Sequence, residues 1–244
     1  GMTYARFWTH RSGNSGFYGI NLPSSVGGNF VYNPEFVDKF SLEGDDRNQQ
    51  IIGGPLYVRD PVTYKATTTP WIVSGVHVTL TKEIELIDMQ TLDVGNDLKG
   101  RSQGYRSVKF YMDLKTTSAQ SRNQSNDVPI FRYADVLLMK AEAIMRGASA
   151  TGGDTPVSLM NQIRAYVNAP LVTGNPTLDD LLDERAREFA DESWRRNDLI
   201  RFGKFEDDWG FKHIVNPNAK NQKFRRIFPI PTYVLNTNTT WSQN

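Results

Sequence analysis

Residues 127–143 read DVPIFRYADVLLMKAEA and decide the fold of the second half of the chain. From Arg132 to Arg146 the small and apolar residues recur with the i, i+3, i+4, i+7 spacing of a helix that buries one face. They are Ala134, Leu137, Leu138, Ala141, Ile144 and Met145. Because Gly147 is a natural stop, this spacing predicts a helix over 132–146.

The residues that follow predict a partner for this helix. Thr155 is a good N-cap residue, and apolar side chains with helical spacing run from about Pro156 to Val167. The Gly-rich segment 147–154 joins the two helices into an antiparallel hairpin. A small residue such as Ala141 allows the two helices to approach closely.

A third helix is predicted to start at Thr177, whose hydroxyl caps the backbone while Asp180 completes a variant capping box. We expect it to run to about Phe202, with one apolar side buried and the other side densely charged. Acid and base stand four residues apart, acid first, in Asp183 and Arg187, Asp191 and Arg195, and Glu192 and Arg196. Because an exposed pair contributes only about 0.3–0.5 kcal/mol, these pairs are interpreted as local support for an exposed helix face.

The first half of the chain differs in composition from the second, and the change falls near residue 128. It is rich in Gly, Asn, Ser and Thr, with turn signals every few residues. Short apolar runs predict one interrupted strand within 72–80 and another strand over 108–112. Asn33 and a proline after it predict a short helix over 34–40. The chain is therefore predicted to be mainly α, with long irregular loops and a few short strands.

Composition and charge exclude several classes of protein. The 28 basic and 27 acidic side chains give a net charge of +1, whereas nucleic-acid-binding domains carry a strong basic excess on one face. The longest apolar runs span only a few residues, and a membrane-spanning helix needs about 20. There is no cysteine, which excludes disulfides, thiolate metal sites and cysteine nucleophiles. With 39% hydrophobic and 11% aromatic residues, the chain is predicted to fold.

The sequence shows no pattern typical of catalysis, of a metal site or of a cofactor. His10, His77 and His213 match no metal-ligand spacing, and we expect them to lie at the surface or to be satisfied locally. Nucleophile-elbow, phosphate-loop and dinucleotide motifs are absent. The carboxylates of the third helix have arginines one turn away, which keep them ionised, the opposite of what a general acid needs. We therefore predict that the chain is not an enzyme and has no metal or cofactor.

A basic segment near the C-terminus has two interpretations. Four cations surround Phe224, and they are Lys220, Lys223, Arg225 and Arg226. They can form a patch for an acidic partner. Alternatively, they form a solvated turn ahead of a buried strand over 227–231, which the neutral total charge favours.

Aromatic residues of the loop-rich half indicate a ligand site. Sugars bind by stacking their C–H faces on aromatic rings, while Asn, Arg and Asp side chains hydrogen-bond the hydroxyl groups. Exposed rings on loops suit this chemistry, although large aromatics also dominate burial in irregular regions. The candidate glycan-binding residues are Trp8, Tyr18, Phe30, Tyr32 and Trp71.

Several stretches resemble one family, the SusD/RagB-like outer-membrane nutrient-binding lipoproteins of Bacteroidetes. The segment 127–143 is similar to the family's Pro-Ile-(Phe/Leu)-Arg-Tyr-Ala-(Asp/Glu)-Val-Leu-Leu-x-x-Ala-Glu-Ala helix. Residues 184–203, ERAREFADESWRRNDLIRFG, are similar to its Glu-Arg-x-x-Glu-(Phe/Leu)-Ala-x-Glu-(Gly/Ser)-x-Arg-x-x-Asp-Leu-x-Arg helix. Asp191 and Asn197 depart from it, because aromatics are common there. Residues 228–231, FPIP, and the Asn-rich tail resemble the family's C-terminus.

The resemblance covers roughly residues 33–244 and implies a SusD-like α/α superhelix of tetratricopeptide-like hairpins. Family members are usually about twice as long, so the chain is identified as a truncated or short member that corresponds to their C-terminal half. We expect residues 1–127 to form a loop-rich, ligand-facing region with short strands. Residues 128–244 would form the helical region, intertwined with the first in one domain.

The resemblance further implies a non-catalytic protein of polysaccharide utilisation. Such proteins bind glycan on the outward face of the outer membrane and deliver it to a SusC-like TonB-dependent transporter. They are held there by a lipid anchor, which we expect to lie outside these 244 residues. Glu184, Arg187, Glu188 and Asp198 would belong to the scaffold. Two alternatives stay open: a helical-repeat protein-interaction module, and a peptide-binding member of the same family.

Overall fold

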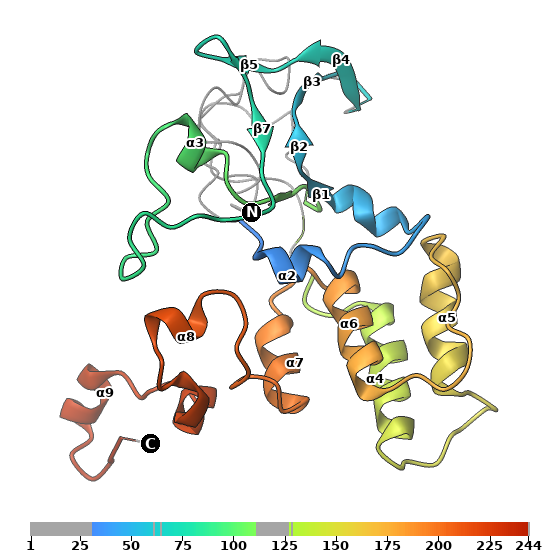
Figure 1. Cartoon of the computed structure of the whole chain (residues 1–244). Coiled ribbons are helices and arrows are strands. Elements are labelled where there is room, and N and C mark those ends of the chain that lie inside the picture. The colour runs from blue at the N-terminus through green and yellow to red at the C-terminus, as the bar shows by residue number, and fades with distance from the viewer. Residues whose placement is uncertain (1–30, 61, 64, 111–126, 128, 244) are drawn as a thin grey trace.

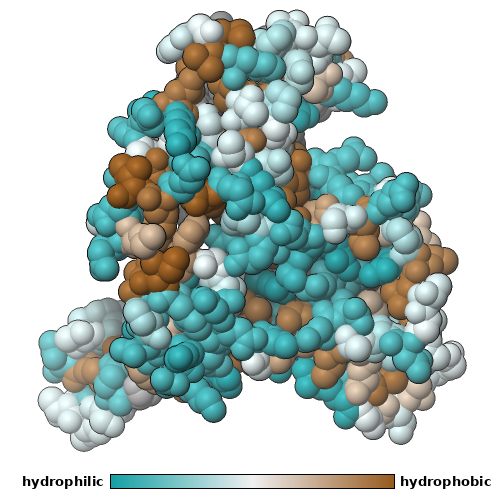
Figure 2. All heavy atoms as spheres, in the orientation of Figure 1, coloured by the Kyte–Doolittle hydropathy of each residue, from teal (hydrophilic) through white to brown (hydrophobic). Residues whose placement is uncertain are grey.

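The computed structural model describes residues 31–60, 62–63, 65–110, 127 and 129–243. Short strands gather at one end of the molecule, a group of helices lies beside them, and an arm of short helices extends from that group (Figure 1). Polar side chains cover much of the face shown in Figure 2. No helix in the described ranges is both long enough and apolar enough to cross a membrane. The prediction of a mainly helical fold with few short strands is confirmed.

The helical group is built on a hairpin. Helix α4 spans Tyr133–Met145 and helix α5 spans Pro156–Tyr166, each within one residue of its predicted bounds. Thr155 caps α5, because its hydroxyl accepts a 3.0 Å hydrogen bond from the N–H of Ser158 and its own N–H donates to the Ser158 hydroxyl at 2.9 Å. Helix α6, Leu178–Glu188, packs against α4 and completes a three-helix core.

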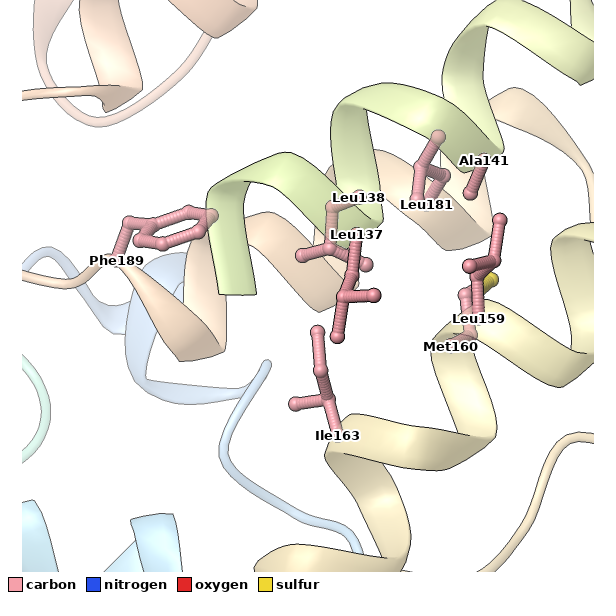
Figure 3. Packing of buried hydrophobic residues seen from close by; sticks show 8 residues of the cluster. All are labelled: Leu137, Leu138, Ala141, Leu159, Met160, Ile163, Leu181 and Phe189. Atoms are coloured by element: carbon pink, nitrogen blue, oxygen red, sulfur yellow. The ribbon is translucent and has the colours of Figure 1, made fainter. Parts of the chain in front are cut away.

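Apolar side chains from all three helices meet in one buried cluster (Figure 3). Its members are Leu137, Leu138, Ala141, Leu159, Met160, Ile163, Leu181 and Phe189. Leu138, Met160 and Leu181 are 0% exposed. Because full burial of such a side chain stabilises the fold by roughly 1.5–3 kcal/mol, this cluster holds the helices together.

The predicted third helix is interrupted. It begins at its predicted cap, Thr177, but the expectation of one helix to residue 202 is wrong, because α6 ends early and a separate helix α7 spans Arg195–Arg201. Between the two helices, Asp191 and Ser193 have φ angles of 60° and 65°. This left-handed conformation is unfavourable for residues other than glycine and cannot continue a right-handed helix.

The charged side of α6 is buried, so the expectation of an exposed face is wrong. Glu184 is 0% exposed and lies among three guanidinium groups. Its Oε1 is 2.8 Å from Arg47 Nη2, and its Oε2 is 2.8 Å from Arg164 Nε and 2.7 Å from Arg187 Nη2. Burial by itself raises the pKa of Glu184, but these cations outweigh it and hold the pKa below its usual value. Arg187 thus pairs with Glu184 rather than with Asp183.

A second buried group of charges ties α4, α6 and α7 together. Arg185 is 1% exposed, and its guanidinium lies 2.8 Å from Asp135 Oδ1 on α4 and 3.0 Å from Asp198 Oδ2 on α7. Asp198 also pairs with Arg201 at 2.7 Å, and Arg201 pairs with Glu142 of α4 at 2.9 Å. The contacts of Asp198 agree with the scaffold role expected of it.

The strand-bearing region contains, among the described residues, four separate two-stranded antiparallel ladders. Its elements are α2 (Pro34–Val37), a 3₁₀ helix (Asp46–Gln50), β1 (Ile51–Ile52), β2 (Gly54–Pro55), β3 (Tyr57–Arg59), β4 (Ala66–Pro70), β5 (Ile72–Val73), β6 (Val76–His77), β7 (Thr79–Leu80), α3 (Leu98–Arg101) and β8 (Arg106–Ser107). The pairs are β1 with β8, β2 with β7, β3 with β4 and β5 with β6. Helix α2 is shorter than the predicted helix over 34–40.

The predicted interrupted strand over 72–80 is a tight hairpin instead. Strands β5 and β6 pair with each other, and Ser74 and Gly75 between them have φ angles of 50° and 78°. Two positive φ angles are what a type I′ turn requires. Strand β8 ends before the predicted strand over 108–112, of which residues 111 and 112 lie outside the described residues.

The C-terminal arm, residues 209–244, follows α7 and the loop after it. It contains α8 (Lys212–Val215), two 3₁₀ turns (Ala219–Asn221 and Lys223–Arg226) and α9 (Thr232–Thr237). Figure 1 shows α8 and α9 extending away from the helical group. The expectation of a buried strand over 227–231 is wrong, because these residues form no strand and Ile227 and Phe228 are 62% and 73% exposed.

Candidate ligand-binding site

A cavity of about 1110 Å³ lies where α2, α6, α7 and the loop after α7 meet. Its apolar part includes Leu182 and Ala186 of α6, Phe189 after α6, and Leu199 of α7. Cavities of roughly 300–1,000 Å³ hold drug-sized ligands. This cavity is therefore large enough for an oligosaccharide.

Aromatic rings line the cavity from two directions. Tyr32 and Phe36 come from the segment that forms α2, with ring centroids 5.0 Å apart. Phe205 and Trp209 come from the loop after α7, with centroids 6.4 Å apart. All four side chains are half-buried, so they are held in place while part of each residue stays accessible.

Tyr32 is fixed by the turn that interrupts the predicted third helix. Its hydroxyl donates a 2.6 Å hydrogen bond to Asp191 Oδ2, and Asp191 is one of the two residues with positive φ in that turn. Burial, together with the charge of Asp191 and the hydrogen bond to it, raises the pKa of Tyr32 above its ordinary value. The hydroxyl therefore stays protonated at neutral pH and holds the ring against the cavity wall.

Opposite charges pair in the lining of the cavity. Lys39 forms an ion pair with Asp183, and Lys204 Nζ lies 3.1 Å from Asp179 Oδ2. These lysines are neutralised by carboxylates on the same side of α6. Asp207, also in the lining, is exposed in the loop after α7.

Arg195 is placed to bind an oxygen atom of a ligand. Its Nη1 donates to the carbonyl of Leu182 at 3.1 Å, and its guanidinium lies 5.8 Å from the centre of the Phe36 ring. Burial lowers the pKa of Arg195. Within the described residues it makes no ion pair with a carboxylate. Since a guanidinium has five N–H donors, Arg195 can donate to hydroxyl or carboxylate groups in the cavity.

The five predicted aromatic residues do not share one environment in the structure. Tyr32 lines the cavity. Trp71 is 3% exposed and its main chain is hydrogen-bonded to Leu56 and Val78, so the expectation of an exposed ring is wrong for this residue. Trp8, Tyr18 and Phe30 lie outside the described residues, and their roles stay predictions.

Sequence reasoning missed four residues of the cavity: Phe36, Arg195, Phe205 and Trp209. The segment 202–210, FGKFEDDWG, carries the signal that points to two of them, because Phe205 and Trp209 flank a run of three acidic residues. The other two are brought to the cavity by the fold, since Phe36 and Arg195 are far apart in sequence.

Metal ligation has no support in the described part of the chain, where no group of three or more His, Asp or Glu side chains could hold a metal ion. His77 Nε2 lies 2.7 Å from the carbonyl of Leu56, and His213 Nδ1 lies 3.2 Å from Asp208 Oδ1. Both histidines are satisfied locally, as expected. His10 lies outside the described residues.

The chain belongs to the SusD family, whose sequence profile matches residues 2–244. A curated relative, the starch-binding protein SusD of Bacteroides thetaiotaomicron, is 37% identical over 153 residues, which are 60% of this chain and 27% of the relative. SusD family members are binding proteins without catalytic activity, which supports the prediction that this chain is not an enzyme.

Solved structures show the same fold. A SusD superfamily protein from Parabacteroides distasonis aligns with a TM-score of 0.57 at 20% identity, over 99% of this chain and 46% of its own. A SusD homologue from Bacteroides thetaiotaomicron aligns with a TM-score of 0.55 at 17% identity, over 99% and 42%. The chain thus spans less than half the length of these neighbours. The identification of a SusD/RagB-like protein is confirmed.

Proposed function

We propose that the chain binds glycan as part of nutrient uptake at the outer-membrane surface. Membership of the SusD family carries this proposal, and a relative named for starch binding supports it. The cavity supplies suitable chemistry. Tyr32, Phe36, Phe205 and Trp209 offer aromatic surface to the C–H groups of a sugar, and Arg195 offers donors to its oxygen atoms.

The same proposal includes the fate of the glycan and the place of the protein. The bound glycan would pass to a SusC-like TonB-dependent transporter, and a lipid anchor would hold the protein on the outward face of the membrane. The cavity draws residues from both sides of the boundary at 127/128. We therefore keep the proposal that a ligand-facing region, 1–127, and a helical region, 128–244, are intertwined in one domain.

Affinity gel electrophoresis against starch, pullulan, xylan and polygalacturonate tests glycan binding. We expect Trp209→Ala and Phe36→Ala to weaken binding by at least about tenfold, as truncation of a central aromatic contact commonly does. The matched control is Tyr166→Ala, which removes an aromatic ring that is 88% exposed on α5 and outside the cavity. Thermal unfolding of each variant separates lost binding from lost folding.

A Trp8→Ala variant tests the aromatic residues outside the described part. If Trp8→Ala abolishes glycan binding and Trp209→Ala does not, the binding site lies among the first residues. The assignment of the cavity as the glycan site is then wrong. If wild type binds none of the polysaccharides, glycan binding by this chain is wrong.

One observation favours the alternative of a protein-interaction module. An apolar patch on α4 and the residues before it is between 45% and 72% exposed. Its members are Ile130, Phe131, Tyr133, Val136 and Met139. Exposed patches of this kind often mark protein interfaces. If the chain binds no glycan and Val136→Lys weakens its binding to a purified SusC-like transporter, the protein-interaction module replaces the glycan-binding proposal. Binding to a peptide array would instead favour a peptide-binding member of the family.

A further inference from the structure

The C-terminal arm carries a charge excess that the chain as a whole lacks. The 36 residues from Trp209 to Asn244 contain five Lys or Arg and no Asp or Glu, whereas the whole chain is almost balanced. The residues before the arm are therefore acidic overall. Such separation of charge indicates a local preference for an anionic partner.

Of the four cations around Phe224, three lack a carboxylate partner in the described residues: Lys220, Lys223 and Arg225. All three are exposed. The fourth, Arg226, is neutralised, because its Nη2 lies 2.5 Å from Glu206 Oε2. Arg225 donates to Gln222 Oε1 at 2.5 Å, which leaves its positive charge unneutralised. A cation whose charge no carboxylate neutralises is available to an anionic ligand, and three of them lie within six residues.

Aromatic side chains accompany these cations at the surface. Phe224 is 62% exposed between Lys223 and Arg225, and Phe228 is 73% exposed. In the space-filling view, apolar side chains lie among polar ones on this arm (Figure 2). Because the predicted buried strand does not form, these rings are not core residues. Ring faces beside cations that lack a carboxylate partner suit a ligand with both C–H faces and negative charge.

Arg196 connects the arm to the cavity. Its guanidinium lies 5.1 Å from the centre of the Phe205 ring and 4.3 Å from that of Phe228, and its Nη2 donates to the carbonyl of Arg225 at 2.7 Å. Both Arg196 and Phe205 line the cavity. The arm is thus a continuation of the cavity wall.

We propose that Lys220, Lys223, Arg225 and the rings of Phe224 and Phe228 form a second subsite, which binds an acidic polysaccharide that extends from the cavity. The proposal rests on the proposed function, because the ligand is a glycan. A membrane surface is less well matched. Interfacial helices present one long apolar face, whereas these residues lie on two short 3₁₀ turns and α9 has only six residues.

The test compares two triple variants of the full chain in affinity gels that contain polygalacturonate. The first is Lys220→Ala/Lys223→Ala/Arg225→Ala. The matched control is Lys65→Ala/Lys82→Ala/Lys99→Ala, which removes the same charge from the strand-bearing region. Since one contact between opposite charges at about 4 Å in water changes affinity roughly fivefold, we expect the first variant to lose at least about tenfold and the control about twofold or less. Raising the salt concentration should weaken wild type more than the first variant.

Three outcomes overturn the proposal: wild type does not bind polygalacturonate, both triple variants lose affinity equally, or only phosphatidylglycerol vesicles depend on the three cations. Pullulan, a neutral glycan, separates this failure from failure of the proposed function. If pullulan or starch binds and depends on Trp209 while polygalacturonate does not bind, the glycan function stands and the acidic subsite is wrong. If no polysaccharide binds at all, both are wrong.

Discussion

Replacing Glu184 by Gln tests whether the buried charges of α6 hold the scaffold together. Glu184 is 0% exposed and contacts three guanidinium groups at 2.7–2.8 Å. At an effective dielectric constant near 20, one pair of charges 4 Å apart attracts by about 4 kcal/mol, and the cost of removing the charges from water offsets much of that gain. Removing one partner leaves the others buried without compensation. We therefore expect Glu184→Gln to lower the free energy of unfolding by about 3–5 kcal/mol.

Urea unfolding followed by circular dichroism measures this loss, provided that the slope of free energy against urea is unchanged. The matched control is Glu85→Gln, since Glu85 pairs with Lys99 at 2.7 Å but both side chains are more than 70% exposed. Exposed ion pairs contribute little to stability, so the free energy of unfolding of Glu85→Gln should be close to that of wild type. Equal losses in the two variants would refute the argument that burial makes the Glu184 contacts important.

Lowering the pH should remove the stabilisation that the Glu184 carboxylate gives the wild-type fold. The cations around Glu184 hold its folded pKa below the ordinary value of 4.5, despite burial, which raises it. A carboxylate with a depressed pKa stabilises the fold fully above its unfolded pKa and loses that contribution as the pH falls through the folded pKa. The difference in stability between wild type and Glu184→Gln should therefore shrink below about pH 4.5.

Three further substitutions test the packing, and each is measured by urea or thermal unfolding. Leu138→Ala should lose about 2–5 kcal/mol, because it empties space at a side chain that is 0% exposed; a loss below that of an exposed Leu would contradict the assigned core. Thr177→Ala should cost about 1 kcal/mol while Thr177→Ser costs little, because the hydroxyl caps α6; equal effects would argue against the cap. Gly100→Ala should cost roughly 1–3 kcal/mol, because its Cβ would lie 2.3 Å from the carbonyl oxygen of Val94; unchanged stability would show that the segments are not in contact.

The helical hairpin could be predicted from the sequence because its signals are local. The period of apolar residues from Ala134 to Met145 and the cap at Thr155 depend only on nearby residues, and α4 and α5 follow them within one residue. Strand prediction failed at Ser74 for the opposite reason. A serine with positive φ is uncommon, so the hairpin turn was hidden within a run of strand-forming residues.

The burial of charge on α6 could not be predicted from α6 alone. The pairs at i, i+4 suggested a solvated face, but Arg47 comes from a segment more than 130 residues earlier. Arg164 comes from α5 and approaches the same carboxylate. Local spacing shows which charges are neighbours on a helix, whereas the fold determines which distant charges replace water around them. The candidate cavity was missed for the same reason, since Phe36 and Arg195 meet only in the folded chain.

The turn between α6 and α7 connects the scaffold to the candidate site. Glu188, at the end of α6, pairs with Arg47 at 3.2 Å and with Arg132 at 2.8 Å, so the beginning of the turn is fixed by buried charge. The chain then reverses through the positive φ of Asp191, which costs of order 1–3 kcal/mol in a non-glycine residue. That conformation aims the Asp191 carboxylate at the Tyr32 hydroxyl, and α7 restarts so that Arg195 enters the cavity. An uninterrupted helix over the same residues would continue past both positions. The strained turn is therefore the feature that converts a segment of charged scaffold into one wall of a binding cavity.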